Sequence, residues 1–373
     1  MRTMRPPGWK IAAVLLVGIL AISFGSILVR LALRASGDQS LAFSLVMSAG
    51  RLALAALLLA PGWTRPLEGR AGLPFALAAG GFLALHFAFW ITSLSYTSVA
   101  ASTALVTTNP VWVTLLGWWL FGERPSFLTL LGVGVALLGG VLIGLGDSEG
   151  GGGANPLLGD FLALLGAVAA SCYFLLGREA QRRGLSTWAY VRVAYTAAAL
   201  LLLPLPYLFG GGYGGYPLEV YAYLLLMALL PQLVGHTSFN WATRHIPPVL
   251  VTLAILFEPV GASLLAYFLG EFANAYVLAK LKVRTEGRFF WLRALASTLV
   301  GQGLDTGVFL LVAFYGVFPK EVLLAVFLSN YAFKLGVEAL MLPFTYAVVG
   351  FLKRAEGMDA YDRDTDFNPF RLT

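Results

Sequence analysis

The stretch FAFWITSLSYTSVAASTALVTTNPVWVTLLGWWLFGE at residues 87–123 decides the fold, because it returns in altered form as SFNWATRHIPPVLVTLAILFEPVGASLLAYFLGE at residues 238–271. Both copies join an aromatic-rich helix end to an apolar run that contains a polar residue followed by proline. That dipeptide is Asn109-Pro110 in the first copy and Glu258-Pro259 in the second, and each copy closes on Gly-Glu. The repetition predicts a chain built from two related halves.

Long apolar stretches fill the chain almost from end to end. Hydrophobic residues make up 58% of the sequence and charged residues 12%, and the mean hydropathy is +0.79. A bilayer core about 30 Å thick is crossed by roughly 20 helical residues, and backbone groups that find no water in lipid must pair within a helix. The sequence therefore predicts an all-α, polytopic membrane protein with about eleven spans, at residues 11–33, 40–61, 73–95, 99–121, 127–145, 157–177, 187–209, 218–241, 249–270, 289–316 and 321–352.

The repeat unit is five spans long in this scheme. Since five is an odd number, the second unit enters the membrane from the opposite side and forms an inverted repeat. Inverted repeats are typical of secondary transporters, which bind their substrates near the middle of the membrane between the repeats. A proline within a span bends the helix and frees a backbone carbonyl, which suits a helix that lines a cavity. A role in helix packing alone explains the prolines equally well.

Small residues recur every four positions in the third span, at Ala76, Gly80, Ala84 and Ala88. Such a stripe lets two helices approach closely in lipid. We expect it to be a packing surface and not a binding site.

The charges of the loops predict the orientation, because Lys and Arg accumulate on the cytoplasmic side. The N-terminus carries Arg2, Arg5 and Lys10, and the even-numbered loops are basic as far as the eighth span. The fifth loop, GDSEGGGGAN, is acidic and glycine-rich. We expect a multi-pass protein of a bacterial cytoplasmic (inner) membrane, with a cytoplasmic N-terminus and a periplasmic linker at residues 147–156.

These features, in their order along residues 10–271, resemble the EamA type of the drug/metabolite transporter superfamily. The matching residues include Arg51, Trp90, Asn109-Pro110 and Glu258-Pro259. The resemblance implies a transporter that moves small metabolites through a central cavity between two five-span repeats. On this basis residues 1–146 form the first repeat, and residues 157–271 form an incomplete second repeat of four spans.

Polar and aromatic residues within the spans are the candidates for the cavity, because polar groups in lipid usually face a cavity or one another. Arg51 is expected to contact an anion or carboxylate, to form a structural pair with Glu258, or to extend as a snorkelling side chain. His86 and His236 titrate near neutral pH when unperturbed, so a proton is a candidate coupling ion, although an interhelical hydrogen bond explains them as well. The proposed cavity residues are Trp90, Asn109, His236, Asn240, Trp241 and Glu258.

After Gly270-Glu271 the sequence resembles the C-terminal half of the VUT family of queuosine-precursor transporters, for example in FLSNYAFKLGVEALMLPFTYAVVGFLKRAE. Residues 272–373 are therefore expected to form a half-domain of two spans and a polar tail, in place of the last helix of the second repeat. The resemblance implies a 7-deazaguanine substrate. Helical spacing places Asp305 and Lys334 where they can neutralise each other between two helices. The candidate residues of this part are Glu271, Asn274, Gln302, Asp305, Asn330 and Lys334.

The join between the two parts creates a conflict of topology. Counting nine spans from a cytoplasmic N-terminus places the next loop outside, yet this region carries Lys280, Lys282, Arg284, Arg288 and Arg293. Such a cluster favours the cytoplasm. Either an earlier span does not cross, or the last helices are frustrated, or the chain is an accidental fusion.

Three functions follow from the sequence. The first is a secondary transporter that exports small metabolites by alternating access, the second is a queuosine-precursor importer, and the third is a non-functional fusion of the two. An enzyme is not expected, because no nucleophile–base constellation and no metal-ligand spacing is present. The expected partners are a small-molecule substrate and the lipid bilayer, without nucleic acid, metal or cofactor.

Overall fold

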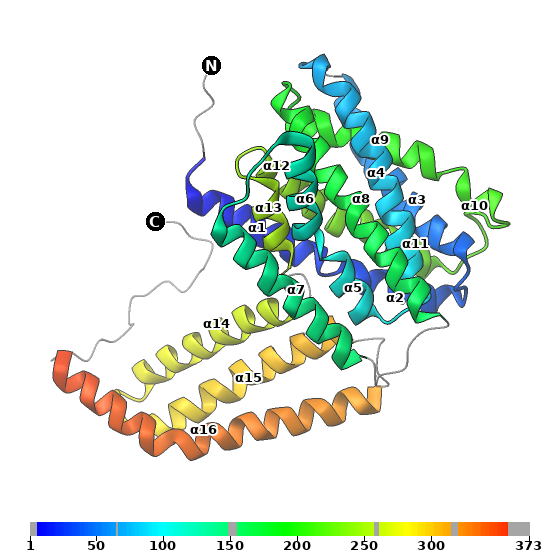
Figure 1. Cartoon of the computed structure of the whole chain (residues 1–373). Coiled ribbons are helices and arrows are strands. Elements are labelled where there is room, and N and C mark those ends of the chain that lie inside the picture. Colours follow the sequence, from blue (N-terminus) through cyan, green and yellow to red (C-terminus); the bar gives the residue numbers. More distant parts are fainter. Residues whose placement is uncertain (1–5, 65, 148–154, 257–260, 315–319, 357–373) are drawn as a thin grey trace. The chain divides into compact units, whose positions relative to one another are not determined.

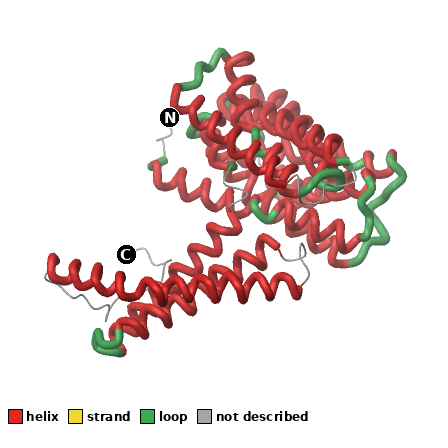
Figure 2. The backbone as a smooth tube through the Cα atoms, turned by 60° about the horizontal axis from the view of Figure 1, so that its bottom comes forward, coloured by secondary structure: helices red, strands yellow, loops and turns green. Residues whose placement is uncertain are grey.

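The computed structural model describes residues 6–64, 66–147, 155–256, 261–314 and 320–356. Every regular element among them is helical, as Figure 2 shows. Nine helices of the described part are long and apolar enough to cross a membrane, which confirms a polytopic helical membrane protein. Most of the predicted linker at 147–156, the Glu258-Pro259 pair and the tail beyond residue 356 lie outside the described residues.

The chain divides into two compact units, Met1–Gly261 and Ala262–Thr373. The first half of unit 1 begins with a span that is interrupted at Ser23-Phe24, so that two helices replace one. Its helices are α1 (Gly8–Ile22), α2 (Gly25–Ser36), α3 (Leu41–Leu58), α4 (Leu73–Ser93), α5 (Val99–Val106), α6 (Asn109–Phe121) and α7 (Phe127–Asp147), with the short turns η1 (Ala60–Thr64) and η2 (Arg70–Gly72) between α3 and α4.

The second half of unit 1 contains a π-helical segment, η3, in the middle of its third span. Pro231 lies inside this segment and cannot donate a backbone hydrogen bond, so the helix widens locally to accommodate it. The elements are α8 (Pro156–Arg182), α9 (Thr187–Leu202), α10 (Leu205–Leu208), α11 (Leu218–Met227), η3 (Ala228–His236), α12 (Thr237–Thr243) and α13 (Pro248–Ile255).

The fourth predicted span is broken at the Asn-Pro dipeptide. Helix α5 ends at Val106, and α6 begins at Asn109 with Pro110 in its first turn, where proline needs no hydrogen-bond partner for its nitrogen. The predicted bend at this proline is therefore confirmed. Its counterpart at Glu258-Pro259 falls in the segment outside the described residues.

The helix contacts of unit 1 follow the symmetry of a duplicated chain. Helix α4 packs on α8, α3 on α9, α1 on η3 and α6 on α13, and α4, α8 and α9 can be followed in Figure 1. These contacts join the third span to the sixth, the second to the seventh, the first to the eighth and the fourth to the ninth. If each span is replaced by the span five places away in the sequence, the pairing of spans three and six becomes the pairing of spans eight and one. The pairings of spans two and seven and of spans four and nine stay the same. Two halves related by a twofold axis produce this pattern.

Unit 2 consists of α14 (Gly261–Arg284), α15 (Phe290–Phe314) and α16 (Lys320–Glu356). Helices α14 and α15 approach closely at two glycines: a Cβ atom on Gly270 would lie 2.8 Å from the carbonyl oxygen of Gly301. The prediction that the ninth span ends at residue 270 is wrong, because α14 continues to Arg284. Its counterpart Gly122 does end a helix, with a φ of 66°, so the two Gly-Glu pairs have different structural roles.

Candidate functional site

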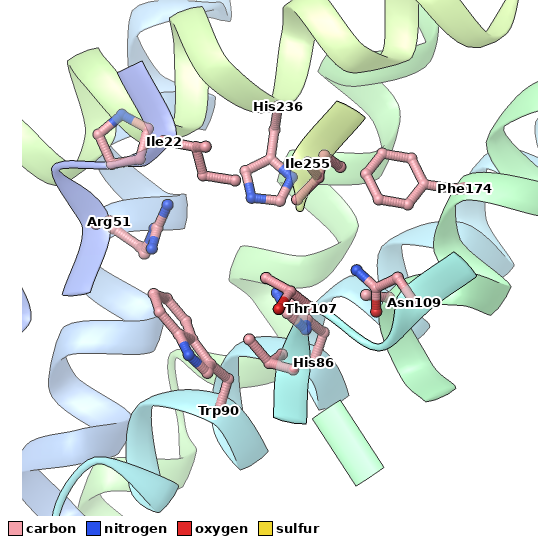
Figure 3. Close-up of a pocket in the computed structure, with 13 residues that line it drawn as sticks. Ile22, Arg51, His86, Trp90, Thr107, Asn109, Phe174, His236 and Ile255 are labelled. Carbon is pink, nitrogen blue, oxygen red and sulfur yellow. The ribbon is translucent and has the colours of Figure 1, made fainter. Parts of the chain in front are cut away.

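A buried cavity in unit 1 collects polar side chains from both halves of the repeat. Its volume is about 30 Å³ when counted as space open to the centres of water molecules, which is room for about two waters and too little for a metabolite. Figure 3 shows the side chains that surround it. The lining residues are Ile22, Gly25, Arg51, His86, Trp90, Val106, Thr107, Asn109, Ala170, Phe174, Pro231, His236 and Ile255.

Arg51 brings a permanent positive charge to this cavity. Its side chain, on α3, is 1% exposed, and its guanidinium carbon lies 4.0 Å from the centre of the Phe87 ring on α4. A guanidinium over an aromatic face is attracted by the ring quadrupole. The cavity therefore contains a buried cation that remains charged at any physiological pH.

Two histidines meet in the cavity, one from each half. His86 on α4 and His236 at the end of η3 have ring centres 6.2 Å apart. His86 Nδ1 lies 2.9 Å from the carbonyl oxygen of Gly166 on α8. Since a carbonyl only accepts, Nδ1 carries the proton and Nε2 of the neutral ring is left as an acceptor. The interhelical hydrogen bond expected for a histidine is thus confirmed for His86.

The ring of His236 lies among aromatic side chains. Its centre is 5.3 Å from that of Phe87 in an edge-on contact, and it stacks on Phe174 at 6.4 Å. Its Nδ1 atom is buried without a hydrogen-bond partner among the described residues. The two histidines therefore differ: His86 is fixed by the backbone, whereas His236 keeps one ring nitrogen for a ligand or water.

Trp90 and Asn109 complete the polar lining. The Trp90 indole is parallel to the His86 ring at 6.1 Å, and its Nε1 atom is also buried without a partner in the described part of the chain. With its amide oriented to suit its neighbours, Asn109 donates to the carbonyl oxygens of Val106 and Ala167 at 2.8 and 3.0 Å. Asn109 thereby ties the break between α5 and α6 to α8.

The structure places half of the six cavity residues predicted from sequence around the cavity, namely Trp90, Asn109 and His236. Asn240 and Trp241 are not in its lining. Asn240 is fully buried and donates to the hydroxyl group of Tyr173, and Trp241 packs against His245 with ring centres 4.5 Å apart.

Glu258 lies outside the described residues, so its predicted role stays a prediction. The lining also includes residues that were not in the set predicted from the sequence, among them Arg51, His86, Thr107 and Phe174. The signals for three of them were present: Arg51 and His86 are ionisable residues within spans, and Thr107 lies just before the Asn-Pro break.

A second polar cluster lies within unit 2. Lys334 Nζ on α16 is 2.6 Å from Asp305 Oδ2 on α15 and 3.4 Å from the hydroxyl oxygen of Thr306. This confirms the predicted neutralisation between the two helices.

The amide residues of the predicted set lie beside this ion pair. A Cβ atom on Gly301 would lie 2.6 Å from the Cβ of Asn274. The side-chain oxygens of Asn274 and Gln302 are buried without a donor among the described residues. Asn330 lies one turn before Lys334 on α16, and Glu271 lies on the exposed side of α14.

Comparison with known proteins finds two families in this chain. The EamA-like transporter family matches residues 9–145 and again residues 157–279. The putative vitamin uptake transporter family matches residues 219–348. Residues 219–279 therefore match both families.

Three curated relatives illustrate the two similarities. A probable queuosine precursor transporter of Bacillus subtilis is 38% identical over 125 residues, which are 33% of this chain and 55% of that protein. A probable terminal-alkyne amino-acid exporter of Streptantibioticus cattleyicolor is 28% identical over 178 residues, 46% of this chain and 58% of that protein. An uncharacterized transporter of Clostridium kluyveri is 27% identical over 201 residues, 52% of this chain and 64% of that protein. The chain thus spans between half and two thirds of the length of these relatives.

The EamA-like family matches the chain in two ranges, which lie where the sequence predicts the two repeats. Together they cover well over half of the chain. The protein belongs to the EamA-like transporter family.

Proposed function

We propose that the protein is a secondary transporter that exports small metabolites by alternating access through the cavity of unit 1. The observation that carries the proposal is the meeting of the two repeats at this cavity, with His86 from the first repeat facing His236 from the second at 6.2 Å. Secondary transporters bind substrate at such a repeat interface. The exporter named among the relatives supports the direction.

The size of the cavity indicates a contracted state that must widen to admit substrate. The break between α5 and α6 is the candidate hinge, because Val106, Thr107 and Asn109 belong to the lining and flank it. Helix ends at such a break lack the full set of backbone hydrogen bonds, so bending there disrupts fewer of them than bending a continuous helix. Protons remain the candidate coupling ion, with His86 and His236 as the candidate carriers.

The proposed location is the bacterial cytoplasmic membrane with the N-terminus in the cytoplasm. Arg2, Arg5 and Lys10 support this orientation.

Filling the cavity tests the proposal. A Cβ atom on Gly25 would lie 3.4 Å from Cη2 of Trp90 and 3.8 Å from Cβ of Pro231, so the side chain of Gly25→Leu projects into the cavity. A Cβ atom on Gly134 of α7 has no neighbour within 4 Å among the described residues, which makes Gly134→Leu the matched control.

The measurement is the release of metabolites from cells that produce each variant at equal membrane levels. Wild type and Gly134→Leu should release at least one metabolite faster than cells without the protein, and Gly25→Leu should reduce that release to the background. Release by Gly25→Leu at the wild-type rate would show that substrate does not pass through this cavity.

A second candidate function is import of a 7-deazaguanine through unit 2. The side-chain oxygens of Asn274 and Gln302, which are buried without a donor among the described residues, favour it, because two acceptors beside a carboxylate suit the N–H groups of a guanine-like base. The name of the Bacillus subtilis relative points to the same class of substrate.

Uptake of labelled 7-deazaguanine by a strain that cannot synthesise it tests this second function. The double variant Asp305→Lys/Lys334→Asp keeps the ion pair and reverses it. If the pair is purely structural, uptake should survive the exchange. If the carboxylate contacts the base, uptake should be lost. If both assays give no flux for the wild type, the remaining prediction, a non-functional fusion, gains support.

A further inference from the structure

Helix α6 is held against α8 near both of its ends, and the two attachments differ in charge and in exposure. From this difference we infer that Glu123 and Arg178 form a latch, which holds the C-terminal end of α6 on α8 and releases it when the cavity of unit 1 opens. The inference rests on the proposed function and adds a moving part to it. It depends on the geometry of the ion pair, on its access to water and on the position of the break between α5 and α6.

The local sequence places the Glu123 carboxylate beside α8. Gly122 has a φ of 66° and ends α6, and the amide of Glu123 donates to the carbonyl oxygen of Gly117 at 3.2 Å. The side chain then folds back along the helix, since a Cβ atom on Gly117 would lie 3.4 Å from Glu123 Oε2. The other carboxylate oxygen, Oε1, lies 2.6 Å from Nη1 of Arg178 on α8. The ion pair therefore joins the first repeat to the second.

Arg178 depends on this carboxylate. Its side chain is 10% exposed, and its Nε and Nη2 atoms are buried without an acceptor among the described residues. The neighbouring carboxylate of Glu179 instead lies 2.8 Å from Nε of Arg183 and 3.7 Å from Nη1 of Arg182, on the same helix. Removing the Glu123 carboxylate would leave a largely buried cation without its counter-ion, which destabilises the state in which α6 rests on α8.

The attachment at the start of α6 is uncharged and buried. The side-chain amide of Asn109 donates to the carbonyl oxygen of Ala167 at 3.0 Å, and the backbone carbonyl oxygen of Asn109 lies 3.3 Å from the hydroxyl oxygen of Ser171. Both Asn109 and Ser171 are buried. Separating α6 from α8 at this point would deprive polar groups of their partners where water does not replace them, which is costly.

The Glu123 side chain, in contrast, is 41% exposed. When the C-terminal end of α6 leaves α8, water reaches both charges, and an ion pair with access to water contributes little. The Glu123 end is therefore the end of α6 that separates more easily, and the helix turns about its Asn109 end. That end adjoins the break between α5 and α6, which is the hinge of the proposed transport cycle. The basic residues Arg124 and Arg183 predict that the latch faces the cytoplasm.

The reaction rate of a thiol in the cavity tests the latch. The one cysteine of the sequence is removed by Cys172→Ser, and Thr107→Cys places a thiol in the lining. A membrane-impermeant maleimide is added to right-side-out and to inside-out vesicles that contain the full-length protein. A thiol that reacts only in the open state is labelled at a rate proportional to the population of that state. A separate variant, Ser126→Cys, at an exposed residue just after α6, shows which vesicles present the latch end to the reagent.

The variant Glu123→Gln should raise the labelling rate of Thr107→Cys about fivefold from the side on which Ser126→Cys reacts, and should not raise it from the other side. This factor corresponds to the upper end of the range for a partly exposed ion pair. Arg178→Met should raise the rate from the same side. The double variant should not exceed the larger single effect, because either change alone already breaks the pair.

The matched control is Glu179→Gln. It removes a carboxylate of similar ion-pair length from the residue next to Arg178, but that pair lies within α8 and joins no second helix. The labelling rate should therefore stay at the value without this substitution.

Three results would overturn the inference: equal labelling rates for Glu123→Gln and Glu179→Gln, an increase from both sides of the membrane, or single effects that add in the double variant. These outcomes leave the proposed transport route standing as long as Gly25→Leu still blocks metabolite release. Loss of that block removes the route itself, whatever the labelling shows.

Discussion

Helix α4 approaches α9 so closely at Gly80 that a single methyl group should separate them. A Cβ atom on Gly80 would lie 2.7 Å from the carbonyl oxygen of Ala194 and 2.7 Å from the Cβ of Ala197. Neither atom can rotate away, because one belongs to the backbone and the other is bonded directly to it. The variant Gly80→Ala therefore has to push the two helices apart.

The neighbouring glycine supplies a matched control. Among the described residues, a Cβ atom on Gly81 would meet only Cδ1 of Leu201, at 3.9 Å, which is an ordinary van der Waals distance. Both substitutions gain the same helix propensity, about 1 kcal/mol. That gain cancels when the two variants are compared, and the difference in their unfolding free energies reports the overpacking alone. Overpacking by a methyl group costs about 1–3 kcal/mol.

We therefore expect Gly80→Ala to be less stable than Gly81→Ala by about 1–3 kcal/mol, as measured by reversible unfolding in mixed micelles. The loss should extend to transport, since His86 and Trp90 lie six and ten residues further along α4, or about 9 and 15 Å. Equal stability of the two variants would refute the conclusion that the small-residue stripe sets the distance between α4 and α9.

Three further predictions concern single contacts and the topology. The variant Tyr173→Phe removes the acceptor of the buried Asn240 amide and should lower the unfolding free energy by about 1–2 kcal/mol. The control Tyr207→Phe, at a side chain that is 63% exposed, should leave the unfolding free energy unchanged. Equal unfolding free energies for the two variants would contradict the hydrogen bond between Tyr173 and Asn240. The variant Lys334→Met removes the partner of Asp305 and should speed amide hydrogen exchange in α15 and α16, and unchanged exchange would show that the pair does not hold these helices together. A reporter fused near Thr285 should lie in the cytoplasm, because Lys280, Lys282 and Arg284 lie at the end of α14. This outcome requires that one of the nine preceding predicted spans does not cross the membrane. A reporter outside the cell would show that all nine spans cross and that the basic residues do not set the orientation of this loop.

Local patterns in the sequence predicted much of the fold. The bend at Asn109-Pro110 follows from the missing N–H of proline, and the close packing of α4 follows from the spacing of Ala76, Gly80 and Ala84. The Asp305–Lys334 pair follows from two helical faces that each carry one charge. Each of these features depends on residues within a few turns of one another or on a single pair of opposite charges.

The exact lining of the cavity did not follow from the sequence. Phe174 and Ile255 line it, yet apolar residues of this kind face lipid or a neighbouring helix just as often. Asn240 was expected in the cavity because it is a polar residue within a span, and it lies one turn after His236. The Tyr173 side chain comes between them: its ring centre is 6.1 Å from that of His236, and its hydroxyl group accepts from Asn240.

Phe121-Gly122-Glu123 lies at the end of a helix, whereas the corresponding Leu269-Gly270-Glu271 lies within one. The residues that follow each tripeptide explain the difference. After Gly122-Glu123 come Arg124 and Pro125; proline disfavours a helical residue before it and cannot continue a helix. Gly122 accordingly takes a left-handed conformation and ends α6.

After Gly270-Glu271 the chain continues as Phe-Ala-Asn-Ala, without proline or glycine. Nothing stops the helix there, and α14 runs on to Arg284. It is followed by Gly287, where φ is 76° and the amide donates to the carbonyl oxygen of Lys282. The absence of one proline thus turns the last element of an EamA-like repeat into the first helix of unit 2. It also brings Gly270 and Asn274 to α15.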